Sequence, residues 1–283
     1  GSPKVQPAVL TAQTGRAAQR CHPHQQGKNI RNILYIFAGP RRQGDDEECG
    51  LDLNLNISAF DVVRSEDHDL LDDFTWEKII EDIRADVYDA MIASPPCGSF
   101  SVVLGKRAGP RASRGEGKEL IYGLKDLSPD EKKKARIGTA CALRALEAAR
   151  AFNERDAPWL IETSGKHAGT ANLFDLPEYT QFISECPEVE IFPLVQCAFG
   201  AKSVKPSRLM SNIKLKDLEQ HCKHDKSWWR FPGTGKWHFA AHPPLIGRHR
   251  AVPAADWKPG PADKAAPYLT KDAAYYTKDF NMY

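Results

Sequence analysis

A cysteine that follows two prolines and precedes a glycine is the residue of this sequence with the clearest capacity for chemistry. Cys97 follows Pro95-Pro96 and precedes Gly98. The prolines restrict the backbone just before the thiol and the glycine frees it just after, so the thiol is held in a defined position. A structural cysteine usually packs inside an apolar run, as Cys141 is expected to do on its helix. Cys97 has no such surroundings, and this favours a nucleophile.

Four short apolar runs are each followed by a residue that could take part in a binding or catalytic site. The runs cover 33–37, 57–60, 88–93 and 159–161 and are bounded by residues that break strands. Runs of this length are typical of buried strands in a parallel sheet. They are followed by a glycine turn, an acid, the cysteine and a second acid, namely Gly39, Asp61, Cys97 and Glu162. Since ligands bind outside the carboxyl ends of parallel strands, this coincidence predicts an active site.

Helices are predicted between these runs. Ser128 and Glu131 form a capping box around Pro129, and apolar residues recur every three or four positions behind it. A shorter helix is expected at 76–83. Strands that alternate with helices indicate an α/β protein with a doubly wound, Rossmann-like sheet.

The charge balance limits how the protein can bind nucleic acid. Lys and Arg number 39 against 37 Asp and Glu among 283 residues, a formal net charge of +2. A polycation is excluded, so contacts with phosphates must come from a local basic patch. The seven cysteines are irregularly spaced without a Cys-x-x-Cys pair, which favours reduced thiols inside a cell, in the nucleus if the source is eukaryotic. No apolar run approaches the ~18 residues of a membrane span.

Several segments resemble motifs of the DNA cytosine-5 methyltransferase family. Pro95-Pro96-Cys97 resembles the family's catalytic motif, and residues 36–39 resemble its first, S-adenosylmethionine-binding motif. Residues 159–164 stand where the family has its Glu-Asn-Val motif. The segments 197–200, 205–209 and 211–212 are similar to the compact phage or mobile-element branch. The resemblance runs in order over about residues 32–283 and implies a Rossmann-like class I methyltransferase sheet with a small recognition lobe.

The resemblance implies S-adenosylmethionine-dependent methylation of cytosine C5 in DNA, on a base flipped out of the duplex. Cys97 would add to cytosine C6, Glu162 would hold N3 and the exocyclic amine, and Arg208 would hold the O2 carbonyl or a flanking phosphate. The expected cofactor residues are Phe37, Ala38, Gly39, Asp61, Asp69 (in preference to Asp72) and Pro95. We expect a monomer that has DNA as its partner and does not bind membranes.

A basic, glycine-rich loop after Cys97 is expected to neutralise phosphates. Its cations include Lys106, Arg107, Arg111 and Arg114, and Lys205 is expected to add a further cation. A solvated loop without a partner is the plainer interpretation of the same residues.

The chain is predicted to consist of a disordered tail or linker at 1–29, a catalytic domain at 30–212, a target-recognition region at 213–250, and a C-terminal segment at 251–283 that packs back on the catalytic domain. Aromatic and basic residues at 228–231 and 237–239 favour groove insertion or base stacking, or else a small aromatic core. This region also contains residues of the types that bind zinc, namely His221, Cys222, His224, His238, His242 and His249. Their spacing fits no standard finger, so no metal is predicted.

Some positions depart from the family pattern. Thr163-Ser164 replace Asn-Val, Gly98 replaces a glutamine, and no final Gly-Asn-Ser-Val-type motif is found. Three alternatives therefore stay open: a catalytically silent nucleic-acid-binding relative, an RNA cytosine-5 methyltransferase, and an unrelated α/β thiol enzyme. The sequence does not place a histidine beside Cys97, so it gives no support for a hydrolase with a Cys-His pair.

Overall fold

A six-stranded sheet with the order β2-β1-β3-β4-β6-β5 forms the centre of the protein. The computed structural model describes residues 30–100, 112–166, 170–201, 204–215, 218–230 and 237–242. The strands are β1 (Asn32–Ile36), β2 (Asn56–Phe60), β3 (Ala90–Ala93), β4 (Trp159–Ser164), β5 (Glu190–Val195) and β6 (Pro206–Ser211). They run in one direction except β6, which pairs antiparallel with both β4 and β5. The predicted α/β class with a Rossmann-like sheet is confirmed.

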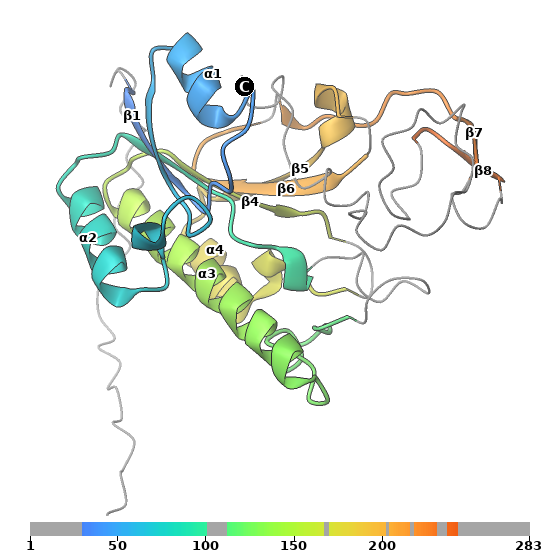
Figure 1. Ribbon diagram of the computed structural model, residues 1–283, viewed down its shortest axis with the longest axis horizontal. Coiled ribbons are helices and arrows are strands. Elements are labelled where there is room, and N and C mark those ends of the chain that lie inside the picture. The colour runs from blue at the N-terminus through green and yellow to red at the C-terminus, as the bar shows by residue number, and fades with distance from the viewer. Residues whose placement is uncertain are drawn as a thin grey trace, which may run out of the picture.

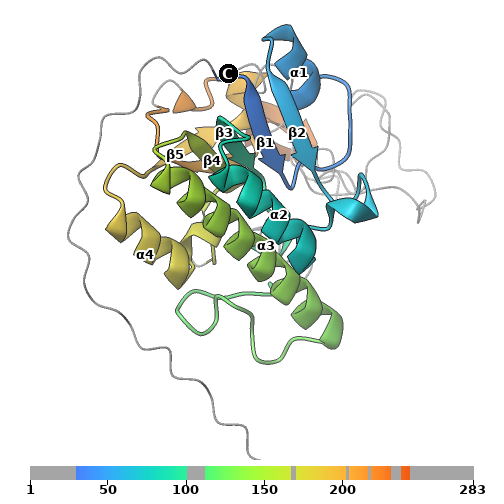
Figure 2. The same ribbon diagram turned by 90° about the vertical axis from the view of Figure 1, so that its left-hand side faces the viewer.

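Helices cover both faces of this sheet. The α-helices are α1 (Asp46–Asp52), α2 (Asp73–Arg84), α3 (Pro129–Glu154) and α4 (Pro177–Glu185), and the 3-10 turns are η1 (Glu66–His68), η2 (Gly98–Phe100), η3 (Leu173–Asp175) and η4 (Gln196–Phe199). Helices α2, α3 and α4 lie on one face and α1 on the other (Figure 1 and Figure 2). The predicted capping box begins α3, because Glu131 N donates to Ser128 Oγ and Ser128 N donates to the Glu131 carboxylate.

Side-chain alternation along the strands divides the core between the two faces. The larger cluster joins the sheet to α2, α3 and α4 and includes Trp76, Phe152 and Trp159. The smaller cluster consists of Phe192, Leu194, Phe199 and Leu209. Residues directly opposite each other in neighbouring strands point to the same face. Glu162, which pairs with Leu209, therefore faces the smaller cluster.

The strand order reverses at β1, which has β2 on one side and β3 on the other. Ligands of open α/β sheets bind outside the carboxyl ends of the strands at such a reversal. In register, Ile36 is level with Ala93, and Ala93 is level with Ile161. The segments that carry Gly39, Cys97 and Glu162 therefore reach the same edge of the sheet.

A separate antiparallel hairpin, β7 (Ser227–Arg230) and β8 (Trp237–Ala240), lies to the right of the sheet in Figure 1, past the carboxyl end of β5. It belongs to the predicted recognition region, and the rings of its cross-strand pair Trp228 and Phe239 have centroids 5.3 Å apart. The predictions for 1–29, Lys106, Arg107, Arg111 and 251–283 fall outside the described residues. Among the described residues, no helix combines the length and the apolar character that crossing a bilayer requires.

Candidate active site

The half-buried Cys97 thiol lies within electrostatic reach of the Glu162 carboxylate, at the ends of β3 and β4. Burial raises the pKa of the Cys97 thiol, and the charge of Glu162 raises it further. Lys205, predicted as a nucleic-acid contact, lowers the same pKa, and so do the polar groups of Ser164. Glu162, Ser164 and Lys205, from the ends of β4 and β6, thus all act on the Cys97 sulfur. The predicted nucleophile and the predicted base-holding acid therefore interact.

The Glu162 side chain is in an unusual position for a carboxylate. It is 7% exposed, and its Oε1 has no hydrogen-bond partner among the described residues. Ser207 Oγ on the neighbouring strand β6 is also buried and lacks a partner in the described part of the chain. Buried polar atoms are nearly always hydrogen-bonded, because an unmade bond costs about 1–3 kcal/mol. Two such oxygens beside a strand end indicate a site for a polar ligand.

Tyr35 connects strand β1 to this site. Its hydroxyl lies 3.2 Å from Ser94 Oγ, at the start of the Pro-Pro-Cys segment, and Ser94 N donates to Ile36 O at 3.1 Å. Burial raises the pKa of Tyr35, and the charges of Asp46 and Glu162 add to this effect. Both carboxylates therefore lie near the Tyr35 hydroxyl. The sequence analysis missed Tyr35 and Asp46, although a tyrosine inside an apolar strand was a signal.

Arg114 supports the Cys97 loop from behind and is only 5% exposed. Its Nε and Nη2 donate to Ser99 Oγ at 3.1 and 3.0 Å, and Nη2 also donates to the carbonyl of Ala135 on α3 at 2.5 Å. Its guanidinium lies 3.8 Å from the centroid of the Phe100 ring. The prediction that Arg114 contacts nucleic acid is therefore wrong, because its donors are directed into the protein. It is a positioning residue for the loop that carries the thiol.

Arg208 points away from the Cys97–Glu162 pair. It pairs in register with Thr163, so its side chain lies on the opposite face of the sheet from that of Glu162. There its Nη1 donates to Asn172 Oδ1 at 3.1 Å. The predicted contact of Arg208 with the O2 carbonyl of the base is therefore corrected. Its alternative role, toward a flanking phosphate, stays a prediction.

The turn after β1 has an uncommon backbone conformation. Phe37 has a φ of 58°, which is an outlier for a bulky residue, and Gly39 has a φ of 69°. A Cβ placed on Gly39 would meet no heavy atom within 4 Å, so the backbone is open on that side. Strained residues persist only where their surroundings impose the strain, and they cluster at ligand sites. The turn is suited to a ligand that approaches the backbone closely.

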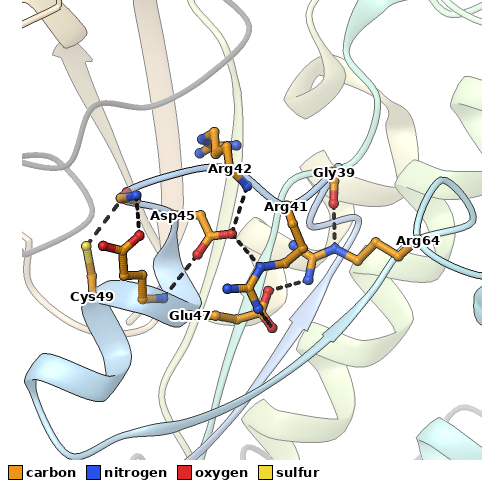
Figure 3. Close-up of polar contacts among 9 residues, drawn as sticks. Gly39, Arg41, Arg42, Asp45, Glu47, Cys49 and Arg64 are labelled. Carbon is orange, nitrogen blue, oxygen red and sulfur yellow. Dashed lines mark hydrogen bonds and ion pairs between the residues drawn. The ribbon is translucent and has the colours of Figure 1, made fainter.

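Hydrogen bonds and ion pairs hold this turn in place (Figure 3). Gly39 N donates to Asp61 Oδ2 at 2.8 Å, and Gly39 O accepts from Arg64 Nε at 2.5 Å. Arg64 also pairs with Glu47, which pairs with Arg41 at 2.6 Å. The turn is thereby tied to the end of β2 and to α1.

Asp61 and Asp69 lie near a common point on α3. Burial raises the pKa of the Cys141 thiol on that helix to about 12, and the charges of Asp61 and Asp69 both contribute. Asp72 is used differently, because it caps α2 by accepting from Thr75 N at 2.8 Å. The preference for Asp69 over Asp72 as a ligand-binding acid is therefore consistent with the structure, although the contact itself stays a prediction, as it does for Pro95.

Comparison with known proteins finds solved structures of low similarity, among them two methyltransferases. No family model matches the chain, and no curated protein matches its sequence. The crystal structure of S. pombe Dnmt2 methyltransferase is 13% identical with a TM-score of 0.36, over 66% of this chain and 53% of that one. The Entamoeba histolytica methyltransferase EhMeth is 12% identical with a TM-score of 0.35, over 71% and 59%. The chain thus spans less than two thirds of the length of either protein. Similarity at these TM-scores and identities carries no information about a substrate.

Proposed function

We propose that this protein is an S-adenosylmethionine-dependent methyltransferase that methylates C5 of cytosine in DNA. The observation that carries the proposal is the buried Glu162 Oε1, which lacks a hydrogen-bond partner among the described residues and lies near the Cys97 thiol. The Watson–Crick edge of a flipped cytosine offers an exocyclic amine, and a protonated N3, as donors for such an oxygen. A nucleophile and a base-holding acid at one sheet edge are the two groups that this reaction requires.

The covalent step uses the Cys97 sulfur as nucleophile. The thiolate adds to C6, forming an S–C6 bond, and the electrons of the C5–C6 double bond make C5 nucleophilic. Once C5 carries the methyl group, a base removes the C5 proton, the double bond re-forms, and Cys97 leaves as thiolate with the electrons of the S–C6 bond. Glu162, bonded to N3 and the amine, stabilises the charge that develops on the ring.

The charges around Cys97 couple substrate binding to thiol activation. Burial and the Glu162 carboxylate both raise the pKa of the thiol, so the free protein favours the protonated form. A cytosine that donates hydrogen bonds to Glu162 disperses the charge of that carboxylate. Lys205 continues to favour the thiolate. We infer that the nucleophile becomes reactive when the correct base is bound.

The turn after β1 fits the expected cofactor. The open side of Gly39 lets a ligand approach the backbone, and Asp61 is hydrogen-bonded to Gly39 N. Asp61 and Asp69 both lie near Cys141 of α3 and supply carboxylates there. S-adenosylmethionine, when bound, supplies an electrophilic methyl group on a sulfonium. The residues proposed to hold it are Phe37, Ala38, Gly39, Asp61, Asp69 and Pro95.

Exposed aromatic side chains and cations are proposed to bind the DNA. Trp228, Trp237 and Phe239 on the β7–β8 hairpin are 65%, 60% and 57% exposed. Exposed aromatics provide surfaces on which bases stack, and grouped apolar surface marks interaction sites. The proposed phosphate contacts are Lys106, Arg107, Arg111 and Lys205.

Mechanism-based trapping tests the proposal. The full chain, incubated with labelled S-adenosylmethionine and duplex DNA that contains 5-fluorocytosine, should form a complex that resists denaturant, because fluorine at C5 cannot leave as a proton. Cys97→Ser should form none, whereas Cys186→Ser, a half-buried cysteine outside the site, should trap DNA normally.

Each other outcome would reject a stated part of the proposal. Trapping of RNA but not DNA of the same sequence would mean an RNA substrate. DNA binding without methyl transfer or trapping would indicate a silent relative. Methyl transfer at the full rate by Cys97→Ser would exclude the covalent mechanism.

A further inference from the structure

Four metal-binding side chains meet where the β7–β8 hairpin adjoins the catalytic sheet. Cys197 lies in η4, directly after β5, Cys222 and His224 precede β7, and His242 follows β8. Their ligand atoms, two sulfurs and two imidazole nitrogens, all lie within 4.8 Å of one another. Three separate segments of the chain contribute, so the cluster is a product of the tertiary structure.

Two separations within the cluster are close to those around a tetrahedral ion. Zinc bonds of about 2.3 Å to sulfur and about 2.0 Å to nitrogen place neighbouring ligand atoms about 3.3–3.8 Å apart. Cys222 Sγ lies 3.6 Å from His224 Nδ1 and 3.2 Å from His242 Nε2. The two imidazole rings have centroids 4.7 Å apart and meet at 71°, so they are not stacked. Both histidines instead direct a ring nitrogen at the same sulfur.

The hairpin beside the cluster lacks an apolar core of its own in the part of the chain that the structure describes. The large side chains Trp228, Trp237 and Phe239 are all more than half exposed. A two-stranded hairpin alone is at best marginally stable in water. Small modules that cannot bury enough apolar surface are commonly held together by a structural metal.

We propose that Cys197, Cys222, His224 and His242 bind one structural Zn²⁺ that fastens the hairpin to the catalytic sheet. Thiolates and imidazoles suit zinc, whereas magnesium and calcium require oxygen ligands. All four positions of the tetrahedron are filled by side chains, which is the property of a structural site rather than a catalytic one.

This site revises the expectation that no metal is bound. The spacing of the ligands fits no standard finger because Cys197 belongs to the catalytic domain. His221 was weighed as a ligand but is not in the cluster. The side chain of His238, and all of His249, lie outside the described residues.

The ion would also support the segment that approaches the thiol. Gln196, which precedes Cys197, donates its backbone N–H to Lys205 O at 3.2 Å. Lys205 in turn lowers the pKa of Cys97. Loss of the metal is therefore expected to disturb both the hairpin and the position of Lys205. This consequence rests on the proposed function, whereas the binding of zinc does not.

Metal analysis of the purified full chain tests the proposal. After gel filtration, the wild type should retain about one zinc per chain. Cys222→Ser and His224→Asn should each lower the zinc content at least tenfold and lower the Tm, because bound metal stabilises only the folded state. His221→Asn removes an exposed histidine of the same loop that is outside the cluster and should leave both values unchanged. A wild type without zinc, or full zinc content in His224→Asn, would overturn the site.

A measurement on the wild type alone covers the case in which the variants do not fold. Metal-free protein titrated with Co²⁺ should develop sulfur-to-cobalt charge-transfer absorption and the visible bands of tetrahedral cobalt, and added Zn²⁺ should abolish both. Octahedral cobalt bands, or a Cys197–Cys222 disulfide that takes up no metal after reduction, would contradict the proposal. None of these readouts depends on methyl transfer, so failure of the proposed activity is distinguishable from failure of the metal site.

Discussion

The carboxylate of Glu162 raises the pKa of the Cys97 thiol from the neighbouring parallel strand. The group proposed to hold the base therefore suppresses the nucleophile for as long as its charge is not shared with a ligand. A substitution that removes the charge of Glu162 should therefore have two opposite effects. It should favour ionisation of the Cys97 thiol and should slow methyl transfer.

Glu162→Gln should make Cys97 alkylate faster and methylate more slowly. Loss of the charge lowers the pKa of the thiol, so the thiolate fraction at a given pH rises. Loss of the carboxylate weakens stabilisation of the ring, and methyl transfer should fall by about 10²–10³. Iodoacetamide alkylation against pH, with Cys97→Ser as the blank for the other cysteines, measures the first effect. Slower alkylation of the variant would show that the two groups do not interact.

Lys205→Gln should act on the thiol in the opposite direction. The lysine lowers the pKa of Cys97, so its removal raises that pKa and slows alkylation at fixed pH. The variant should also reduce the salt dependence of DNA binding if Lys205 contacts a phosphate. Lys214→Gln, at an exposed lysine beyond β6, is the control and should change neither measurement. An unchanged alkylation rate in Lys205→Gln would place the ammonium away from the sulfur.

Arg114→Leu should cost stability without affecting the electrostatics of DNA binding. The variant removes the donors that Arg114 supplies to Ser99 Oγ and to the Ile121 carbonyl, so the free energy of unfolding should fall by about 2–4 kcal/mol in urea titrations. Arg136→Ala, at an exposed position of α3, should be near neutral. If Arg114→Leu markedly changed the salt dependence of DNA binding, Arg114 would contact phosphates, as the sequence analysis predicted.

Gly138→Ala should displace the Cys97 loop. A Cβ on this α3 residue would lie 2.5 Å from Ser99 Oγ, so the loop must shift even though alanine favours the helix by about 1 kcal/mol. Alkylation of Cys97 and methyl transfer should both change. Adding Ser99→Ala removes the clashing oxygen, leaving the next nearest atom, Arg114 Nη2, at 3.3 Å. Failure of Ser99→Ala to restore either rate would refute a steric cause.

Asp46→Asn should weaken the pH dependence of stability in mildly acidic solution. Burial raises the pKa of Asp46 from 3.8 to about 6, so the folded state binds this proton more tightly than the unfolded state. The wild type should therefore lose on the order of 1–3 kcal/mol of unfolding free energy as the pH rises from about 4 through 6, relative to the variant. Urea titrations of both proteins at several pH values measure the difference, and parallel curves would show that Asp46 is not perturbed.

Local features of the sequence were sufficient to predict the central strands and the long helix that position the site. The capping box at Ser128 and the four apolar runs, which end before Gly39, Asp61, Cys97 and Glu162, are signals contained within a few residues. They predicted α3 and the strands β1 to β4. The carboxyl ends of parallel strands meet at one edge in any such sheet, so the strand assignments placed Cys97 and Glu162 at the same edge. The pairing of β3 with β4 makes the two residues neighbours.

The roles of the long polar side chains depended on contacts between distant segments. The residues around Arg114 in the sequence have the composition of a solvated loop. Packing against η2 and α3 nevertheless buries its guanidinium. Arg208 lies one residue from Ser207 in β6, and because side chains alternate along a strand, this single step places it on the other face of the sheet. Cys197 meets His242 only because the hairpin folds back on the end of β5. Residue order specifies which groups are available, and register and packing select the partners that they reach.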